Sequence, residues 1–358
     1  MVILFTFLIL CKIVMSSLEK KNVLVTGGAG FIGSHLCEKL IKTSRVICLD
    51  NFVTGNVSNI DFLLQHPDFV FIRHDVVESI DLESFPELER FKIKFQGLQE
   101  IYNLACPTSA KDFDKFKIAT LAANSVGMKN VLDLAVKYKA KFVHASSSVV
   151  YGPRQEDKEF FREEDLGCVD HLTPRGCYDE GKRFSETMVG TYREAYNLDA
   201  KIARIFRTYG PRERLFDGEM VPDFIIDALD NKDLIIYGDK NFSTSLCYVD
   251  DVVSGFMKLM AAPSDIGPVN LGSNEDLKLL DVAEKIISMT GSESKIVFEK
   301  PLLFMTALGL PDTSKAKELL GWVPLVRLED GLQKSIDYTQ AYKPLLRQQG
   351  MVDDRDKS

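Results

Sequence analysis

The chain of 358 residues is predicted to be an α/β protein, with a doubly wound parallel sheet followed by a smaller C-terminal α/β lobe. Two observations support this prediction. Short apolar runs alternate with helical patterns through the first half of the chain, which is typical of strand–helix–strand units. The first of these units also has glycines at Gly27, Gly30 and Gly33, between an apolar run and a helical pattern.

The strands of the sheet are expected in a series of apolar runs. The first, VLVT, covers 23–26, and the second, RVICLD, ends at Asp50. Three more runs, FVFIRHD, LQEIYNLAC and AKFVHASSS, end at Asp75, Cys106 and Ser148. Apolar spacing predicts helices over 34–42 and 112–138, and the charged segment 84–97 lies where another connecting helix is expected.

The pattern loosens after Pro211. Helical stretches over 222–230, 250–260, 280–290 and 313–320 mix with the short strands LIIYG and KIVFE. This mixture favours a lobe that covers the carboxyl edge of the sheet. The expected division is a hydrophobic segment over 1–20, a first domain over 21–210, a lobe mainly over 211–342 and a charged tail over 343–358.

The glycine-containing unit predicts a ligand as well as a turn. A strand, a glycine turn and a helix place a dinucleotide pyrophosphate on the N-terminus of that helix. Gly27 permits the tight turn, Gly30 the close approach of the phosphates, and Gly33 the packing of helix on strand. Asp50 lies twenty residues past Gly30, where a carboxylate would accept the ribose hydroxyls and repel a 2′-phosphate. A Rossmann-type domain that binds NAD is therefore favoured over NADP binding, and over a tight turn with no ligand.

The second chemical motif is Tyr178 with Lys182, in YDEGK. Four residues apart on a helix, the two side chains share one face. The ammonium is expected to lower the pKa of the phenol, as a tyrosine base requires. Ser147, at the end of a predicted strand, would hydrogen-bond the substrate oxygen whose proton Tyr178 removes. Alternatively, Tyr178 and Lys182 have only a structural role, because this spacing also occurs by chance.

Composition excludes some other functions. The net charge of −8 and the lack of a basic stripe argue against nucleic-acid binding. Seven scattered cysteines without a C-x-x-C spacing indicate reduced thiols in a cytoplasmic protein, and no metal site is expected. The apolar run at 2–11 is interrupted by Lys12 and is too short to span a bilayer. An over-extended start before Met15 is preferred, while a membrane anchor over 2–14 and a cleaved signal stay open.

Several motifs together resemble a known family. They are TGGAGFIGS, the pair Asp50 and Asn51, HDVVE, ASSSVVYG, YDEGKR and TYGPR. The chain is similar over about 21–342 to the extended short-chain dehydrogenase/reductases (the NAD-dependent epimerase/dehydratase family), and within it to UDP-glucuronate decarboxylases. The resemblance implies a sugar-nucleotide substrate, a tightly held NAD that oxidises the sugar at C4, and a homodimer formed through the helices at 112–138 and 178–196.

The resemblance also implies roles for individual residues. The catalytic group would be Ser147, Tyr178 and Lys182. The candidates for substrate contact are Ser147, Arg207 and Arg212, of which Arg207 is this chain's own departure from the family. NAD would contact Gly27, Gly30, Phe31, Ile32, Gly33, Asp50, Asn51, Asp75, Val76, Leu104, Asn124, Tyr178 and Lys182.

The departures from the family lie on the substrate side. Val149 stands where decarboxylases and dehydratases of the family carry a glutamate. Glu219 stands where decarboxylases have an arginine, and it is expected to repel a substrate carboxylate. Arg207 replaces an asparagine, and Thr244 and Leu310 replace basic residues. Three arginines can supply part of the lost charge: Arg207, Arg212 and Arg214.

Three functions are therefore considered. The preferred one is redox chemistry at C4 only, by a ketoreductase or 4-epimerase acting on a nucleotide sugar. The second is decarboxylation of UDP-glucuronate to UDP-xylose. The third is an inactive NAD-binding sensor or scaffold, which would not need Ser147, Tyr178 and Lys182.

Overall fold

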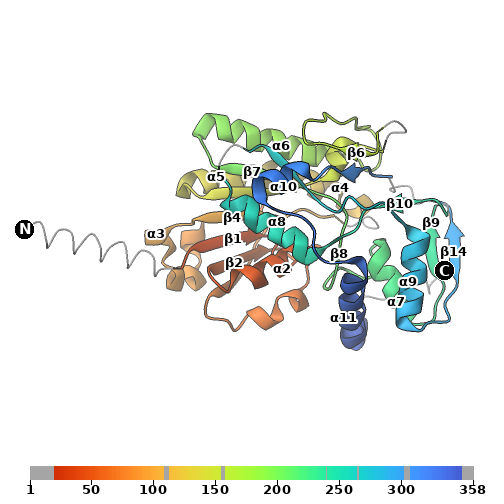
Figure 1. The fold of residues 1–358 in the computed structure, drawn as a ribbon. Helices are drawn as coiled ribbons and strands as arrows, with labels where there is room; N and C mark the ends of the chain where they lie inside the picture. Colours follow the sequence, from red (N-terminus) through yellow and green to blue (C-terminus); the bar gives the residue numbers. More distant parts are fainter. Residues whose placement is uncertain are drawn as a thin grey trace, which may run out of the picture.

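Seven parallel strands form the central sheet, in the order β12-β7-β5-β4-β1-β2-β3 (Figure 1). The computed structural model describes residues 20–108, 113–154, 158–238, 240–263, 266–301 and 307–348, so the apolar run at 2–11 lies outside the described residues. The strand order reverses between β1 and β4, which confirms the predicted doubly wound sheet. The strands are β1 Asn22–Thr26, β2 Arg45–Asp50, β3 Phe69–Arg73, β4 Glu100–Asn103, β5 Lys141–Ser147, β7 Ala200–Ile205 and β12 Pro268–Leu271.

Helices cover both faces of this sheet (Figure 1). Successive strand side chains point to opposite faces, and β1 follows this rule. Val23 and Val25 belong to the same apolar cluster as Leu36 and Val252, whereas Leu24 packs in a second cluster on the other side. The first face carries α2 Phe31–Leu40 and α8 Val249–Ala261, and the second carries α4 Phe113–Ala122, α5 Met128–Tyr138 and α6 Gly176–Tyr196.

Two connections differ from the sequence prediction. The helix expected over 112–138 is interrupted by a π-helical turn, η5 Ala123–Gly127. The segment expected to hold one helix at 84–97 instead forms η4 Pro86–Phe91 and the short α3 Ile93–Gln96, preceded by η3 Leu82–Ser84. Lys92 and Gly97 adopt positive φ angles of 52° and 64°, which end each piece after one or two turns.

The C-terminal lobe lies beside the carboxyl edge of the sheet (Figure 1). It contains α7 Met220–Leu229, α9 Leu279–Thr290, α11 Leu328–Gln348 and the parallel pair β9 Leu234–Tyr237 and β14 Ile296–Glu299. The predicted helices and strands here are found within a few residues. The charged segment expected over 343–358 begins within α11, which continues through Gln348, and Lys343 Nζ donates to Leu229 O at 3.0 Å. Beyond residue 210, α8 and β12 still belong to the main sheet layers.

Short elements complete the described chain. They are η1 Val57–Asn59, η2 Asp61–Leu63, η6 Ser148–Tyr151, α10 Ser314–Leu320 and the strand pairs β6 Phe160–Phe161 with β15 Leu310–Pro311, β8 Thr208–Tyr209 with β11 Cys247–Tyr248, and β10 Ser243–Thr244 with β13 Leu277–Lys278. No helix within the described ranges is long and apolar enough to cross a membrane.

Candidate active site

A pocket of about 680 Å³ lies at the carboxyl ends of the central strands. Parallel strands end together at this edge, and the reversal of strand order between β1 and β4 separates the loops that follow them. Residues after β1, β2, β4, β5 and β7 all line the pocket, and the lobe contributes side chains from α7 and β9. The edge that the sequence predicts for ligand binding is therefore hollow.

The glycine turn after β1 leaves room only for hydrogen at two positions. Gly27 has a φ of +69°, and a Cβ there would meet Ala105 N at 2.8 Å. A Cβ on Gly33 would lie 2.1 Å from Gly27 O, so α2 packs directly on the turn. Gly30 N donates to Gly27 O, and Gly30 begins α2 without a side-chain cap. The backbone thus reaches the pocket unshielded, as a pyrophosphate site requires.

Asp50 ends β2 at the next loop of the pocket. Its carboxylate accepts hydrogen bonds from Ala29 N at 3.0 Å and from Phe52 N at 2.8 Å. Burial raises the pKa of Asp50, and these two bonds oppose that rise. A carboxylate has about four acceptor sites, so two bonds leave capacity for ribose hydroxyls. Asn51 Nδ2 donates to Asp75 Oδ2 at 2.8 Å, which joins the loops after β2 and β3.

The residues expected to contact NAD are almost all brought together. The pocket is lined by Gly27, Gly30, Phe31, Ile32, Gly33, Asp50, Asn51, Asp75, Val76, Leu104, Tyr178 and Lys182. This donor and acceptor set fits a dinucleotide: open amides for the phosphates, a carboxylate for the ribose and apolar side chains around them. These residues would hold NAD.

Asn124, expected to help build the cofactor pocket, is not among the residues that line it in the structure. It lies in the π-helical turn, behind the pocket wall, and is 2% exposed. Its Nδ2 donates to Thr120 O at 2.9 Å and to Cys106 Sγ at 3.1 Å. A Cβ on Gly181 would meet Asn124 Nδ2 at 3.1 Å, so this amide fills the space between η5 and α6. Its contribution to the pocket is indirect, through Cys106.

The three predicted catalytic residues meet at the end of β5. Ser147 ends that strand, and α6 brings Tyr178 and Lys182 to it from the following helix. The side chains of Ser147 and Tyr178 are hydrogen-bonded. Lys182 Nζ donates to Ala145 O at 2.8 Å and lies 5.8 Å from the centre of the Tyr178 ring. The arrangement can take a proton from, or return it to, an oxygen held between serine and tyrosine.

The pKa of Tyr178 differs from the sequence argument. Lys182 was expected to lower it, but burial raises the pKa of this phenol, and nearby Cys106 adds to the rise. The hydrogen bond with Ser147 and the charge of Arg175 act in the opposite direction. Desolvation disfavours the charged form of a group, and here that effect is larger than the pull of the surrounding cations.

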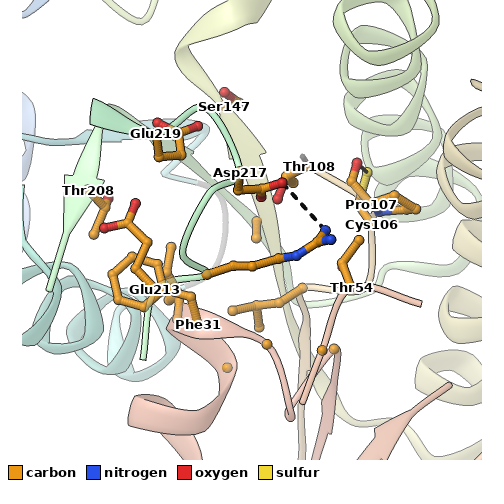
Figure 2. Close-up of a pocket in the computed structure, with 18 of the residues that line it drawn as sticks. Phe31, Thr54, Cys106, Pro107, Thr108, Ser147, Thr208, Glu213, Asp217 and Glu219 are labelled. Atoms are coloured by element: carbon orange, nitrogen blue, oxygen red, sulfur yellow. Dashed lines mark hydrogen bonds and ion pairs between the residues drawn. The ribbon is translucent and has the colours of Figure 1, made fainter. Parts of the chain in front are cut away.

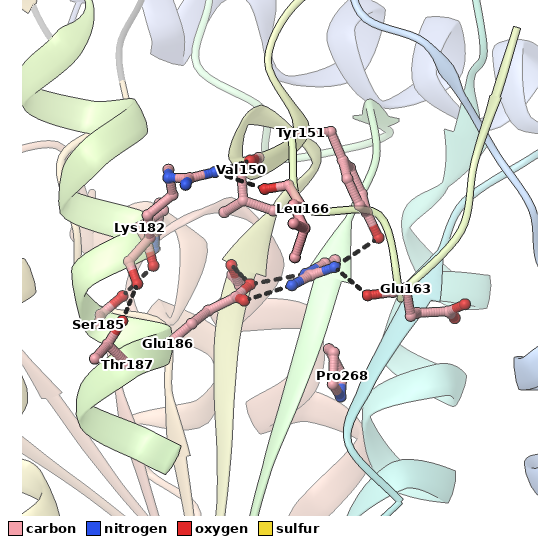
Figure 3. A network of polar contacts seen from close by, with 12 residues as sticks. Val150, Tyr151, Glu163, Leu166, Lys182, Ser185, Glu186, Thr187 and Pro268 are labelled. Carbon is pink, nitrogen blue, oxygen red and sulfur yellow. Dashed lines mark hydrogen bonds and ion pairs between the residues drawn. The ribbon is translucent and has the colours of Figure 1, made fainter. Parts of the chain in front are cut away.

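A buried ion pair fixes α6 against the sheet (Figure 3). Arg204 in β7 binds Glu186 in α6 through two contacts, Nε to Oε1 at 3.0 Å and Nη2 to Oε2 at 2.7 Å. Ser146 Oγ donates to the same Glu186 carboxylate at 2.5 Å, and Arg204 Nη1 donates to Tyr151 Oη at 2.9 Å. Glu186 lies one turn after Lys182, so the network sets the position of α6 relative to Ser147.

Two replaced positions on the substrate side of the pocket, Val149 and Arg207, have clear contacts in the structure. Val149, in η6, is 2% exposed and packs with Tyr178. Arg207 Nη1 lies 3.1 Å from Glu219 Oε2. The expectation that Glu219 simply repels a substrate carboxylate is therefore corrected, because a guanidinium already compensates its charge.

The other arginines of the pocket are also paired. Arg212 has an ion pair with Glu38 and lies over the Phe62 ring at 5.1 Å. Arg214 Nη1 is 3.4 Å from Asp217 Oδ1, and Figure 2 shows this contact beside Glu213 and Glu219. The two other replaced positions, Thr244 and Leu310, are buried in the small β10–β13 and β6–β15 sheets and do not line the described pocket.

Sequence reasoning missed most of the acidic side chains of this pocket. Glu213, Asp217 and Asp223 line it together with Glu219. Burial raises the pKa of Glu213 well above its usual range, and the negative charge of Glu219 adds to this. The signal was present in PRERLFDGE at 211–219, which holds three acidic residues and two arginines in a loop shortly after β8.

Comparisons with known proteins agree with this geometry. The model of the NAD dependent epimerase/dehydratase family matches residues 23–272. UDP-glucuronic acid decarboxylase 1 of Danio rerio is 38% identical over 325 residues, which cover 90% of this chain and 74% of the relative. UDP-glucuronic acid decarboxylase 6 of Arabidopsis thaliana is 37% identical over 313 residues, or 87% of this chain and 86% of the relative.

A solved structure is similar over nearly the whole fold. The UDP-glucuronic acid 4-epimerase of Bacillus cereus, in complex with UDP-glucuronic acid and NAD, aligns with a TM-score of 0.78 and 28% identity, covering 89% of this chain and 99% of that one. The family model and the relatives confirm the resemblance found in the sequence. The chain belongs to the NAD-dependent epimerase/dehydratase family, the extended short-chain dehydrogenase/reductases.

Proposed function

We propose that this enzyme binds NAD, oxidises C4 of UDP-glucuronate and releases the sugar carboxylate as carbon dioxide. The observation that carries the proposal is the meeting of Ser147, Tyr178 and Lys182 in a pocket whose glycine turn and Asp50 fit NAD. Curated relatives named UDP-glucuronic acid decarboxylases support this substrate and reaction. They favour decarboxylation over the C4-only chemistry preferred from sequence alone.

The chain's own residues have distinct tasks in the first step. NAD, when bound, supplies the hydride acceptor for C4. Ser147 hydrogen-bonds the C4 oxygen and Tyr178 takes its proton. Because burial raises the pKa of Tyr178, the phenol needs positive charge nearby to lose its own proton. Lys182 and Arg175 lie 5.8 and 5.9 Å from the ring centre and supply positive charge, which opposes the effect of burial without cancelling it.

The second step follows from the 4-keto group. A carboxylate on C5 is then β to a ketone, so the electron pair of the breaking carbon–carbon bond can move to the ketone oxygen. Ser147 and Tyr178 are placed to hydrogen-bond the resulting enolate oxygen, which stabilises developing negative charge. This cleavage needs no carboxyl group at position 149. To give a pentose, C5 would then take up a proton from water, and the C4 ketone would be reduced again by the hydride held on the cofactor, with Tyr178 returning the proton to the C4 oxygen.

One observation favours a second candidate, C4 redox chemistry without loss of carbon. After decarboxylation, C5 must receive a proton, and the buried Val149 beside Tyr178 cannot donate one. A 4-epimerase or ketoreductase needs no such donor. The structural likeness to a UDP-glucuronic acid 4-epimerase is consistent with that alternative on the same sugar.

The test is an assay of NAD-loaded protein with UDP-glucuronate. The proposal expects carbon dioxide and a UDP-pentose, at about 1 per second or faster. A product that keeps all its carbons but is changed at C4 supports the second candidate instead. No turnover of bound UDP-glucuronate leaves the sensor or scaffold hypothesis. Tyr178→Phe is the control for each product.

We propose a homodimer formed through α4, η5 and α6. Large apolar side chains on these helices are exposed, including Ile118 at 79% and Phe184 at 52%. Exposed apolar groups at such density mark interaction surfaces. Sedimentation of Phe184→Asp, which should shift a dimer toward monomer, tests this surface.

A further inference from the structure

Arg207 lies close to the reacting end of the pocket. It follows β7 by two residues, and Ile205 of β7 is the register partner of Ser147 in β5. Arg207, Ser147 and Tyr178 line the same pocket. The pocket that holds Ser147 and Tyr178 therefore also holds a guanidinium, carried by the chain just beyond the neighbouring strand. The carboxylate of a uronate is attached to C5, one carbon from C4.

The hydrogen-bonding capacity of Arg207 is only partly used. Nη1 binds Glu219 Oε2 at 3.1 Å, while Nε is buried without a hydrogen-bond partner among the described residues. A guanidinium has five N–H donors in a planar fork that matches a carboxylate in two parallel bonds. The single contact with Glu219 is thus less than this side chain can make.

The position of Glu219 allows its side chain to move away from Arg207. It precedes α7 as the N-cap residue with extended backbone and no side-chain cap contact, and its side chain is 32% exposed. Gly218, directly before it, has a φ of +80°. Among the other carboxylates nearby, Asp217 pairs with Arg214, and Asp223 accepts from Phe216 N at 2.7 Å. The buried Glu213 interacts electrostatically with both Arg207 and Glu219. Glu219 is the carboxylate in direct contact with Arg207.

We propose that Arg207 selects sugars that carry a carboxylate, and that Glu219 occupies its guanidinium until the substrate carboxylate displaces it. The inference rests on the proposed function, because it names the group that reads the uronate. Glu219 then acts as an internal competitor. It keeps the half-buried Arg207 guanidinium paired in the free protein and leaves when an anion that makes two bonds arrives.

Calorimetry in the Tyr178→Phe background tests this without turnover. The two ligands are UDP-glucuronate and UDP-glucose, which differ in the carboxylate. Arg207→Gln should weaken the binding of UDP-glucuronate by roughly tenfold or more, about 1.4 kcal/mol. It should change the affinity for UDP-glucose by less than about threefold. Glu219→Gln should increase the affinity for UDP-glucuronate several-fold, because the side chain that competes for Arg207 loses its charge. The affinity for UDP-glucose should stay unchanged.

Two further variants serve as controls. Arg207→Lys keeps the charge but not the fork, so its preference for UDP-glucuronate should fall between those of the parent and Arg207→Gln. Asp330→Asn, in the first turn of α11, breaks an exposed ion pair in which Arg327 Nε lies 3.0 Å from Asp330 Oδ2, and it should change the affinity for neither ligand.

Three outcomes overturn the inference. Equal weakening of both ligands by Arg207→Gln, or looser UDP-glucuronate binding in Glu219→Gln, contradicts it while the proposed function stands. If neither sugar nucleotide binds the parent, the proposed function and the inference fail together.

Discussion

The cofactor side and the substrate side of this pocket are built differently. The cofactor side is centred on the backbone of a glycine turn, with Gly27 and Gly33 packed too tightly for any Cβ. The substrate side consists of charged side chains that pair with one another, such as Arg207 with Glu219. A site made of backbone has one geometry, whereas a site made of ion pairs can exchange partners when a charged ligand arrives.

The largest expected effect is a loss of turnover while NAD binding is kept. Tyr178→Phe should reduce turnover by about a thousandfold or more, because acid–base catalysis contributes on the order of 10² to 10⁴. NAD affinity should change by less than about threefold. Turnover assays and calorimetry check this, and a Tyr178→Phe enzyme with normal turnover would rule out the phenol as the proton carrier.

The cofactor side should tolerate no methyl group at its turn. Gly33→Ala places a Cβ 2.1 Å from Gly27 O, which forces the backbone apart and costs about 2 to 3 kcal/mol of unfolding free energy. NAD binding should weaken as well. Gly190→Ala in α6 is the matched control, since its Cβ meets nothing within 4 Å and should stabilise by up to about 1 kcal/mol. Urea unfolding measures the unfolding free energy of both variants, and equal values would contradict the turn geometry.

His35 joins the two sides and should make stability depend on pH. Its Nε2 contacts Pro211 O at 2.8 Å, and burial, helped by Arg212, lowers its pKa to about 4. Between pH 6.5 and about 4, His35 is protonated in the unfolded chain but stays neutral in the folded chain. The free energy of unfolding therefore falls as the pH falls through this range.

The measurement is urea unfolding of the native protein and His35→Gln at neutral and mildly acidic pH. The native protein should lose about 2 kcal/mol more than the variant on acidification, an order-of-magnitude value from about 1.4 kcal/mol per pKa unit. Parallel losses in both proteins would show that His35 is not the group responsible.

The smallest effect concerns cofactor choice. Asp50 should give NAD at least tenfold tighter binding than NADP, about 1.4 kcal/mol, because its carboxylate repels a 2′-phosphate. Asp50→Asn should reduce that preference while keeping a hydrogen-bond acceptor toward Ala29 N. Equal dissociation constants of the native protein for the two cofactors would defeat the assignment.

The same comparison explains what could be predicted from the sequence. Glycine positions and strand endings determine backbone geometry locally, so the turn at Gly27, the end of β2 at Asp50 and the meeting of Ser147 with Tyr178 could be predicted. The pairing of Arg207 with Glu219 depends on how the loop between β8 and α7 folds, and sequence spacing does not encode it. The pKa of Tyr178 depended on burial, which a motif does not reveal.

The central claim is that Tyr178 drives oxidation at C4 of a carboxylated sugar nucleotide. The most direct measurement is the NADH absorbance after rapid mixing of NAD-loaded enzyme with UDP-glucuronate. The account predicts a rise that is slowed by deuterium at C4 and is absent in Tyr178→Phe. Product formation with no NADH signal and no isotope effect would contradict it.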